Sequence, residues 1–381
     1  AGFAVVLLDV EGEYTFLGEP TDDPQMQEVL HRRGLRRGGV ADLAIYHLVG
    51  RESSNPSHPN RRAFGLQFSR LSPYAVAELL ELTDAQQERF LQAYDATKTI
   101  LRKLHVSNAD DLTLDEFESG FPGMTLDHLI DVAAAFEATV AKTEARFRTT
   151  AFTAKADEVK QTIQPMAAKA SSTASWRALL GKLGRLRRLE VFDRPGVPPL
   201  DYAAMVRPGR VSIVDLSDTD APVLNNLAIA DILRGIQRQQ ETAYEAAEAA
   251  GRVPPKTLVI VEEAHEFLGK ERIDRMPHLF AQVARIAKRG RKRWLGLVFV
   301  TQLPQQLPNQ VIGLVNNWVI HKIGDAAVVG SLKRSVSGID DSLWDRLPGL
   351  APGQAIVSCT HMQRPVLTSI DPTPAKLRMV E

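Results

Sequence analysis

Two adjacent glutamates, Glu262 and Glu263, are the residues best placed for chemistry. They end an apolar, β-branched run at 257–261, which predicts a buried strand of a parallel sheet. Ligands bind at the carboxyl ends of such strands, where two charges are costly unless water or a cation neutralises them. In a nucleotide-hydrolysing site, one carboxylate would hold the water shell of Mg²⁺ and the next would polarise the attacking water. The alternative is a strand that ends at the surface with solvated acids.

A second polar strand end follows after one predicted helix. The apolar run 297–300 is followed by Thr301 and Gln302. An amide at a strand tip can sense a γ-phosphate or position a water molecule, although many strand ends are polar without such a role. Because one helix separates this run from the acidic one, we expect the two on neighbouring strands.

A basic segment lies between these two runs. Six of the nine residues at 285–293 are basic: Arg285, Lys288, Arg289, Arg291, Lys292 and Arg293. On a helix, Arg285, Lys288, Arg289 and Lys292 would share one face. Three interpretations stay open: a solvated charged face, contacts to DNA phosphates, and an arginine that reaches a neighbouring subunit's nucleotide.

A strand-terminal aspartate opens the chain. The apolar run 3–8 ends in Asp9, and a turn with Gly12, Glu13 and Tyr14 follows. This arrangement is common in α/β proteins, so by itself it has little specificity. Two further groups of basic residues, at 177–188 and 32–37, are interpreted as solvated surface.

The elements that must position these residues alternate between strand and helix. Strands are expected at 211–216, 257–261, 295–301, 318–320, 354–358 and 366–370, with helices at 222–249 and 276–289. Such alternation predicts an α/β fold with a mostly parallel sheet flanked by helices. Amphipathic stretches at 73–82, 84–104, 125–148 and 153–164 predict a large, mostly helical insertion. We therefore divide the chain into residues 1–50 and 205–370, which form the sheet region, a helical insertion at 51–204, and a tail at 371–381.

Composition narrows the class of protein. The 381 residues carry 46 basic and 46 acidic side chains, which excludes a uniformly basic coat but leaves room for a local basic channel. The single cysteine, Cys359, favours a reducing, cytoplasmic compartment. The longest apolar runs fall short of the ~20 residues that span a bilayer, so no membrane is expected. Gly269 stands four positions after His265, which excludes a zinc-protease motif. The chain opens on a strand without Met, which predicts a longer parent protein.

Taken together and in order, these patterns resemble the HerA-like ATPases of the FtsK/HerA superfamily (the DUF87 type). Residues 9–14 resemble the Asp-x-x-Gly-Glu-Tyr box of that family, and 259–265 its Walker B strand with Glu-Glu-Ala-His. Residues 288–292 resemble its basic segment, Thr301-Gln302 its sensor strand, and 211–217 a strand that closes on Asp-Leu-Ser. The resemblance covers roughly residues 1–50 and 205–370.

The resemblance implies a RecA-like ATPase core in a homo-hexameric ring around double-stranded DNA, with ATP and Mg²⁺ bound between subunits. Glu262 would contact Mg²⁺ through water, Glu263 would be the catalytic base, and Gln302 the sensor. Asp9, Glu13 and Thr301 would support the nucleotide, and Arg291 or Arg285 would act in trans. Lys288, Arg289, Lys292 and Arg293 would contact DNA. Lys288-Arg289 replaces the usual Arg-Glu pair, and Glu262 replaces the commoner Asp.

The family's phosphate-binding loop does not occur in the sequence. No Gly-x-x-x-x-Gly-Lys-Ser/Thr is present, and Gly181-Lys182 lacks both the hydroxyl residue and the first glycine. We expect the loop upstream of residue 3 in a longer protein, and no ATP hydrolysis by this fragment alone. The expected function is a DNA translocase or helicase motor that acts with an effector nuclease (NurA-like) or a defence effector. The alternatives are a ring scaffold without nucleotide binding and a motor of the conjugation or secretion type.

Overall fold

The computed structural model describes residues 2–107, 115–117, 119–167, 172–219 and 222–378. Six strands form the central sheet in the order β3-β2-β4-β1-β5-β6, and every pairing between them is parallel. The strands are β1 Phe3–Asp9, β2 Leu43–Leu48, β3 Arg61–Phe64, β4 Val211–Asp215, β5 Lys256–Val261 and β6 Leu295–Phe299. This confirms the predicted α/β class and parallel sheet. β2 and β3 were not predicted, and β3 lies inside the range expected to be mostly helical.

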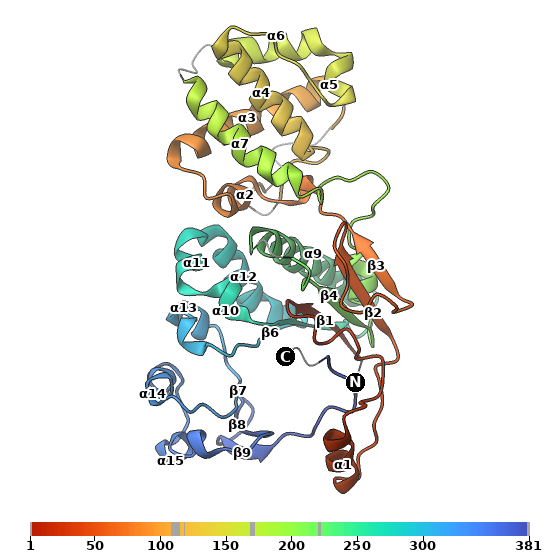
Figure 1. Ribbon diagram of the computed structural model, residues 1–381, viewed down its shortest axis with the longest axis vertical. Helices are drawn as coiled ribbons and strands as arrows, with labels where there is room; N and C mark the ends of the chain where they lie inside the picture. The colour runs from red at the N-terminus through yellow and green to blue at the C-terminus, as the bar shows by residue number, and fades with distance from the viewer. Residues whose placement is uncertain (1, 108–114, 118, 168–171, 220–221, 379–381) are drawn as a thin grey trace.

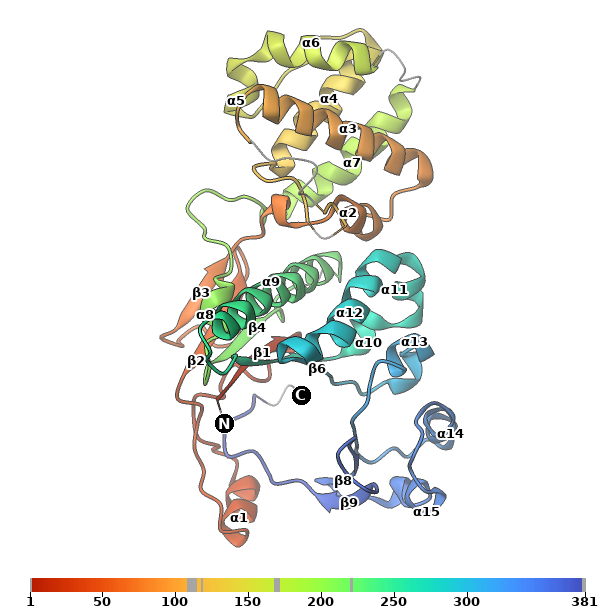
Figure 2. The ribbon, with the colours of Figure 1, turned by 180° about the vertical axis from the view of Figure 1, so that it is seen from behind.

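One face of the sheet is well covered by helices. α9 Pro222–Ala249, α11 Lys270–Arg275 and α12 Pro277–Arg289 lie on the side of the sheet that faces the helical unit in both views (Figures 1 and 2). α8 Tyr202–Met205 and α10 Ala264–Leu268 contribute to the same core. Val6, Leu8, Val259 and Val261 point into this core and are at most 1% exposed. The opposite face has a small core of Leu7, Leu43 and Ile213, and Leu258 and Ile260 are only half-buried there. The continuous apolar run of β5 therefore does not reflect burial on both faces.

The segment between β3 and β4 is mainly a helical unit at one end of the long axis (Figure 1). Its elements are η1 Phe68–Arg70, α2 Pro73–Leu79, α3 Asp84–Lys103, α4 Leu126–Ala141, α5 Thr150–Ala154, α6 Ala156–Ala167 and α7 Thr173–Arg188. The helix expected over 125–148 ends early, because Lys142 adopts a left-handed conformation with φ 55° and ψ 39°. Asp131 then accepts hydrogen bonds from the backbone N–H groups of Arg148 and Thr149. That carboxylate fixes the segment that leads into α5.

The last three strands form a separate sheet rather than an extension of the parallel one. β7 Trp318–Ile320, β8 Gln354–Ser358 and β9 Val366–Ser369 pair antiparallel. Together with α14 Ala326–Ser335 and α15 Asp341–Trp344 they enclose their own core, which includes Leu332, Trp344 and Ile356. These strands were expected within the second part of the parallel sheet region. Short strand runs show no preference between the two kinds of sheet, so their pairing was not predictable. The remaining short elements are η3 Gly290–Arg293, η4 Pro304–Gln306, α13 Asn309–Ile312 and η5 Leu347–Gly349.

The C-terminal segment 371–378 returns to the segment that follows β1. The carbonyl of Pro374 accepts hydrogen bonds from the N–H groups of Thr21 and Gly38, and the N–H of Arg378 donates to the carbonyl of Glu13 at 2.8 Å. Arg33, just after α1 Pro24–Arg32, forms an ion pair with Asp371. Residues 379–381 of the expected tail lie outside the described residues.

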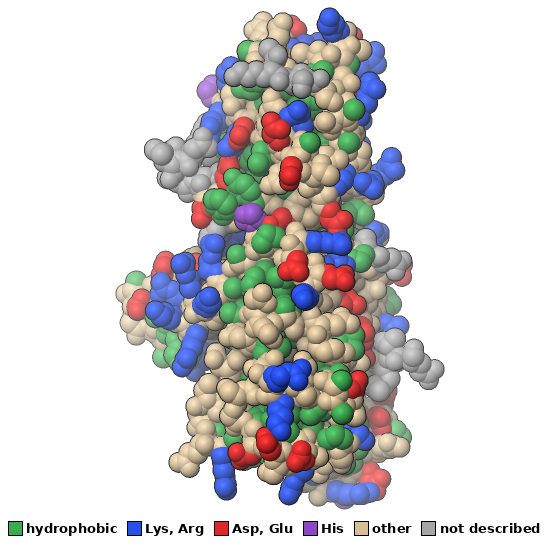
Figure 3. Space-filling view, turned by 90° about the vertical axis from the view of Figure 1, so that its left-hand side faces the viewer, with side chains coloured by type: hydrophobic (Ala, Val, Ile, Leu, Met, Phe, Trp, Pro, Cys, Tyr) green, Lys and Arg blue, Asp and Glu red, His purple; other side chains and the backbone are tan. Residues whose placement is uncertain are grey.

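Charge is mixed over the surface. On the face seen in Figure 3, acidic and basic side chains are interspersed along the long axis, in keeping with the equal numbers of the two in the sequence. No helix in the described part of the chain is both long and apolar enough to cross a membrane.

Candidate nucleotide site

Four buried carboxylates meet at the carboxyl edge of the sheet. Asp9 ends β1, Asp215 ends β4, and Glu262 and Glu263 directly follow β5. The strands β4, β1 and β5 are neighbours in the sheet. Their exposed fractions are 0%, 3%, 6% and 7%. The register pairs Asp9 with Asp215, and the N–H of Glu262 donates to the carbonyl of Leu8. The prediction that Glu262 and Glu263 lie at this edge is therefore confirmed, and we call these four side chains the acidic rim.

Asp9 organises the turn that follows it. One of its carboxylate oxygens accepts hydrogen bonds from the N–H groups of Gly12 at 2.7 Å and Glu13 at 3.2 Å, and the other accepts one from Tyr14 at 3.0 Å. Gly12 has a φ of 76°, and a Cβ atom there would lie 2.0 Å from the Oγ of Ser54. The turn therefore requires glycine, and it brings Glu13 and Tyr14 to the rim.

Asp215 was not among the predicted site residues, nor were its partners. Its carboxylate accepts hydrogen bonds from the hydroxyls of Ser53 at 2.9 Å and Ser217 at 2.6 Å, and from the backbone N–H of Ser54 at 2.6 Å. Ser53 and Ser54 follow β2 after a short loop, and 162 residues separate Ser53 from Asp215. The Asp-Leu-Ser ending of β4 was a usable signal for Asp215. The serines had none, because β2 was not recognised as a strand.

Crowding of carboxylates strongly perturbs Glu262. Burial is the largest effect and, together with the adjacent Asp9 carboxylate, it raises the pKa of Glu262 to about 8. The hydroxyl of Tyr14 acts in the opposite direction, through a hydrogen bond. Burial also raises the pKa of Asp9. The rim therefore binds a proton at neutral pH when no cation is present.

Glu263 is linked to Thr301, which follows β6, through His265. The Nδ1 of His265 lies 3.0 Å from the Oε2 of Glu263 and 3.0 Å from the Oγ1 of Thr301. Glu263 itself has a left-handed backbone, with φ 42° and ψ 47°, a conformation that non-glycine residues adopt mostly at constrained sites. His265 was considered only as part of a protease motif, so its place between Glu263 and Thr301 was not predicted.

Gln302 lies at the same edge of the sheet. β6 is the neighbour of β5, and the N–H of Val300 bonds to the carbonyl of Val261. Gln302 follows Thr301 and is exposed, free to reach a ligand placed over the rim. The structure thus brings Asp9, Glu13, Glu262, Glu263, Thr301 and Gln302 to one edge.

The basic segment lies at the opposite edge. α12 ends at Arg289, and Gly290–Arg293 forms a 3₁₀ turn that leads into the amino end of β6. Arg285 lies one helical turn before the end of α12 and is half-buried, whereas Lys288, Arg289, Arg291 and Lys292 are exposed. The Arg293 guanidinium covers the Tyr244 ring at 4.7 Å.

Lys292 was expected on the same helical face as Arg285. That prediction is wrong, because α12 ends at Arg289 and Lys292 lies in the 3₁₀ turn that follows. The close approach of Gly290 to Leu295, where a Cβ atom would lie 2.8 Å from a carbonyl oxygen, tightens the chain at this point. Because the segment follows the amino edge of the sheet, Arg291 does not reach the acidic rim of its own chain.

The rim fits a hydrated cation that a nucleotide brings with it. The Oε2 atoms of Glu262 and Glu263 are buried and lack a hydrogen bond of good geometry, so both have unused capacity to accept one. Within the described residues, no three His, Cys, Asp or Glu side chains are arranged to hold a metal ion. A cation held here by Glu262 or Glu263 would take its remaining ligands from water or from a bound phosphate.

The sheet has room for another strand beside β6. Among the described strands, β6 is the outermost on its side of the sheet. Its apolar composition is nevertheless that of an interior strand. Val298 is 37% exposed, and Val300, just beyond β6, is 41% exposed. Edge strands with exposed apolar side chains are prone to pair with further strands.

Sequence comparisons show that the chain is similar to helicases named HerA. The family model described as DUF87, "Helicase HerA, central domain", matches residues 1–236. The "DNA double-strand break repair helicase HerA" of Sulfolobus acidocaldarius is 27% identical over 177 residues, which cover 46% of this chain and 34% of that protein. A probable helicase of Methanocaldococcus jannaschii is 36% identical over 114 residues, or 30% of this chain and 21% of its own length. The chain thus spans only about a third or a fifth of the length of these curated relatives.

Among solved structures, VirB4 of Thermoanaerobacter pseudethanolicus has the same fold. The TM-score is 0.50 with 12% identity, over 98% of this chain and 83% of that one. The likeness concerns the fold, a RecA-like, mostly parallel sheet flanked by helices. Because the family model covers more than half of the chain, this protein belongs to the HerA helicase central-domain family.

Proposed function

We propose that this chain is most of the motor domain of a HerA-type ATPase that translocates on double-stranded DNA. The observation that carries the proposal is the acidic rim, where Glu262 and Glu263 each have a buried carboxylate oxygen without a hydrogen bond of good geometry, one strand away from Thr301 and Gln302. Such a site suits a magnesium–triphosphate rather than a neutral ligand, because the bound cation offsets the crowded carboxylates.

Each rim residue has a role on this proposal. Glu262 holds the water shell of Mg²⁺, and Glu263, oriented by His265, accepts the proton of the attacking water. Thr301 fixes His265, and Gln302 senses the γ-phosphate. Asp9 supports the site indirectly by holding the turn that carries Glu13.

The phosphate-binding loop comes from a segment outside these residues. We place the strand that leads into this loop beside β6, the outermost strand, whose free side is apolar. This strand would cover Val298. It would also bring the loop to the carboxyl ends of the strands, where Gln302 lies, because the carboxyl ends of parallel strands lie on the same side of the sheet.

In a ring of identical subunits, the basic edge of one chain would approach the acidic rim of the next. Arg291 or Arg285 would then complete the neighbour's nucleotide site, and Lys288, Arg289, Lys292 and Arg293 would contact DNA phosphates. The separation of the two charged edges across the sheet supports a role in trans, because neither Arg291 nor its neighbours face their own rim. An effector nuclease or defence effector is the partner that we propose for the motor.

The test compares the 381-residue chain with a longer version that carries a phosphate loop. The chain alone should not hydrolyse ATP, whereas the longer version should show DNA-stimulated hydrolysis that is lost in Glu263→Gln. ATP turnover by the short chain, abolished by Glu263→Gln, would contradict the proposed source of the loop.

A non-catalytic ring scaffold is the second candidate, favoured by the absence of a Gly-Lys-Ser/Thr sequence from these 381 residues. It predicts a longer protein that assembles and binds its effector without binding ATP. Equilibrium binding of a fluorescent ATP analogue to the longer protein separates the two candidates.

A further inference from the structure

A carboxylate of the helical unit caps a helix of the sheet region. Glu78 lies on α2, the part of the helical unit that faces α12 in Figures 1 and 2. Its two oxygens accept hydrogen bonds from the backbone N–H of His278 at 3.0 and 3.1 Å, and one of them accepts a further bond from the N–H of Leu279 at 3.3 Å. Glu78 and His278 are 200 positions apart in the chain. We call this set of contacts the interunit cap.

The first turn of α12 depends on this carboxylate. The first four N–H groups of a helix lack partners inside it, and a Ser, Thr, Asp or Asn at the N-cap position usually supplies one. The N-cap residue of α12 is Met276, which forms no side-chain cap, and Pro277 follows it without an N–H. The N–H of Phe280 bonds to the carbonyl of Met276. The two donors that remain in this turn are those bound to Glu78.

Stacked rings hold the two units together beside the interunit cap. The His278 ring is nearly parallel to the Tyr74 ring, with 5.4 Å between the ring centres, and its centre lies 5.9 Å from that of the Phe117 ring. Tyr74 is four residues before Glu78 on α2, so both side chains lie on the same face of that helix. The Nδ1 of His278 also contacts the Glu78 carboxylate. One face of α2 therefore fixes the point at which α12 begins.

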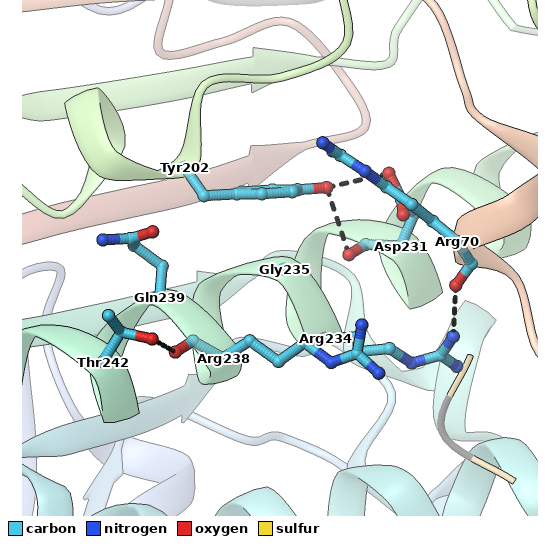
Figure 4. Close-up of a pocket in the computed structure, with 8 residues that line it drawn as sticks. All are labelled: Arg70, Tyr202, Asp231, Arg234, Gly235, Arg238, Gln239 and Thr242. Atoms are coloured by element: carbon cyan, nitrogen blue, oxygen red, sulfur yellow. Dashed lines mark hydrogen bonds between the residues drawn. The ribbon is translucent and has the colours of Figure 1, made fainter. Parts of the chain in front are cut away.

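A separate contact holds the base of the helical unit on α9. The Nη1 of Arg234 donates to the carbonyl of Arg70, at the end of η1, at 2.6 Å (Figure 4). The hydroxyl of Tyr202 donates to Asp231 of the same helix at 2.8 Å. Asp231 and Arg234 are at most 5% exposed. These contacts do not involve α12, so loss of the interunit cap need not detach the helical unit.

α12 connects the interunit cap with basic residues at its other end. Its 13 residues span roughly 20 Å at 1.5 Å per residue. Leu279, Val283 and Ile286 are at most 2% exposed and pack into the core of the sheet region, and the helix ends at Arg289. Because the hydrogen bonds of a helix form cooperatively, a helix of this length opens largely as one unit. A change of capping at its first turn should therefore also loosen its last turn.

We propose that Glu78 is a positioning residue through which the helical unit controls α12 and the basic residues that end it. Movement of α2 away from α12 removes the acceptor of two N–H groups, and α12 then opens more often. The consequence for DNA rests on the proposed contact of these basic residues with phosphates. The effect on α12 itself does not depend on that function.

Hydrogen exchange of the 381-residue chain, followed by mass spectrometry, measures the opening of α12. In Glu78→Ala, the amides from 278 to 289 should exchange about fivefold faster, the usual effect of losing a helix cap. Glu78→Gln keeps one acceptor oxygen, so its exchange should fall between that of Glu78→Ala and that of the wild type. Faster exchange at Lys288 and Arg289 is the result that a purely local cap would not produce.

Glu81→Ala is the matched control, because Glu81 also joins the two units, through an ion pair with Arg275. Both side chains of that pair are at least 60% exposed, so this variant should exchange as the wild type does. Peptides of α9 should be unchanged in every variant, which verifies the fold. Acceleration confined to residues 278 and 279, no acceleration, or equal acceleration in Glu81→Ala would each overturn the proposal.

Duplex binding at constant salt separates this proposal from the proposed function. Glu78→Ala should weaken binding less than Arg289→Gln does, because its basic side chains remain but are held less firmly. If Arg289→Gln weakens binding and Glu78→Ala does not, control of the basic residues by Glu78 is refuted. If neither variant changes binding, the proposed DNA contact of Arg289 fails, and the exchange rates alone decide the role of Glu78.

Discussion

The two edges of the central sheet carry opposite charge in opposite environments. At the carboxyl edge, Asp9, Asp215, Glu262 and Glu263 are at most 7% exposed. Asp9 and Asp215 accept hydrogen bonds from the turn after β1 and from serines. At the amino edge, Lys288, Arg289, Arg291 and Lys292 project into solvent. Burying charge costs free energy, whereas solvated charge costs little. Only the acidic edge is therefore constrained by the fold. Substitutions there should lower the free energy of unfolding as well as change function.

The largest effect is expected from Gly12→Ala, which attacks the packing of the acidic edge. A Cβ atom at Gly12 combines a φ of 76° with an approach of 2.0 Å to the Ser54 Oγ, so the free energy of unfolding should fall by ~3 kcal/mol. Gly50 has a φ of 74° and nothing within 4 Å of its Cβ position, so Gly50→Ala should cost only ~1 kcal/mol. Urea unfolding of both variants measures the difference, and equal losses would show that the rim is not tightly packed.

Glu263→Gln tests the chemistry of the acidic edge. In a version of the protein that hydrolyses ATP, the rate should fall about 100-fold, or ~2.7 kcal/mol of activation free energy, because the water loses its proton acceptor. Glu266, three residues on, is exposed, and Glu266→Gln should retain the rate. Steady-state turnover with saturating DNA measures both, and a rate unchanged in Glu263→Gln would remove that residue from catalysis.

Glu262→Gln should stabilise the isolated chain at alkaline pH. The raised pKa of Glu262, about 8 in the folded state, means that the folded protein binds more protons than the unfolded one between roughly pH 4.5 and 8. The contribution of Glu262 to the free energy of unfolding is therefore fully present below about pH 4.5 and is lost as the pH rises through 8. Removing the ionisable group should raise the free energy of unfolding by ~2 kcal/mol at pH 8.5.

The stabilisation by Glu262→Gln should shrink toward zero at pH 5. Thermal unfolding of the wild type and of Glu262→Gln at both pH values checks this. A difference that is the same at pH 5 and pH 8.5 would contradict the assigned crowding of the rim.

The smallest effect on stability is expected at the basic edge. Arg291→Ala should change the free energy of unfolding by less than about 0.5 kcal/mol, since exposed substitutions rarely do more. In the assembled motor it should still weaken duplex binding or ATP turnover, depending on whether Arg291 contacts phosphate or acts in trans. A large loss of stability in Arg291→Ala would mean that the basic edge is also built into the fold.

The elements that the sequence predicted well are those with long apolar runs. β1, β5 and β6 were identified by composition alone, and so were the polar residues that follow them. β2 was missed because Tyr46 and His47 interrupt its apolar pattern, and β3 because it begins with two arginines at the sheet edge. The serine partners of Asp215 were missed for the same reason, since their contacts join segments 162 residues apart.

Other features depend on tertiary packing that local patterns do not contain. The antiparallel pairing of β7, β8 and β9 depends on the small core around Trp344 and Ile356. The place of His265 between Glu263 and Thr301 depends on β5 and β6 being neighbours. The open face of β5 could not be distinguished from a covered one, because the run is apolar on both sides.

The return of segment 371–378 to the turn after β1 has a mechanical consequence. Arg378 bonds to the carbonyl of Glu13, in the turn that Asp9 organises from the inside. A pull on the C-terminal segment is therefore resisted by several backbone contacts with the segment after β1, those of Pro374 as well as that of Arg378. These contacts lie outside the strand pairings of the sheet, so they can break without separating a strand.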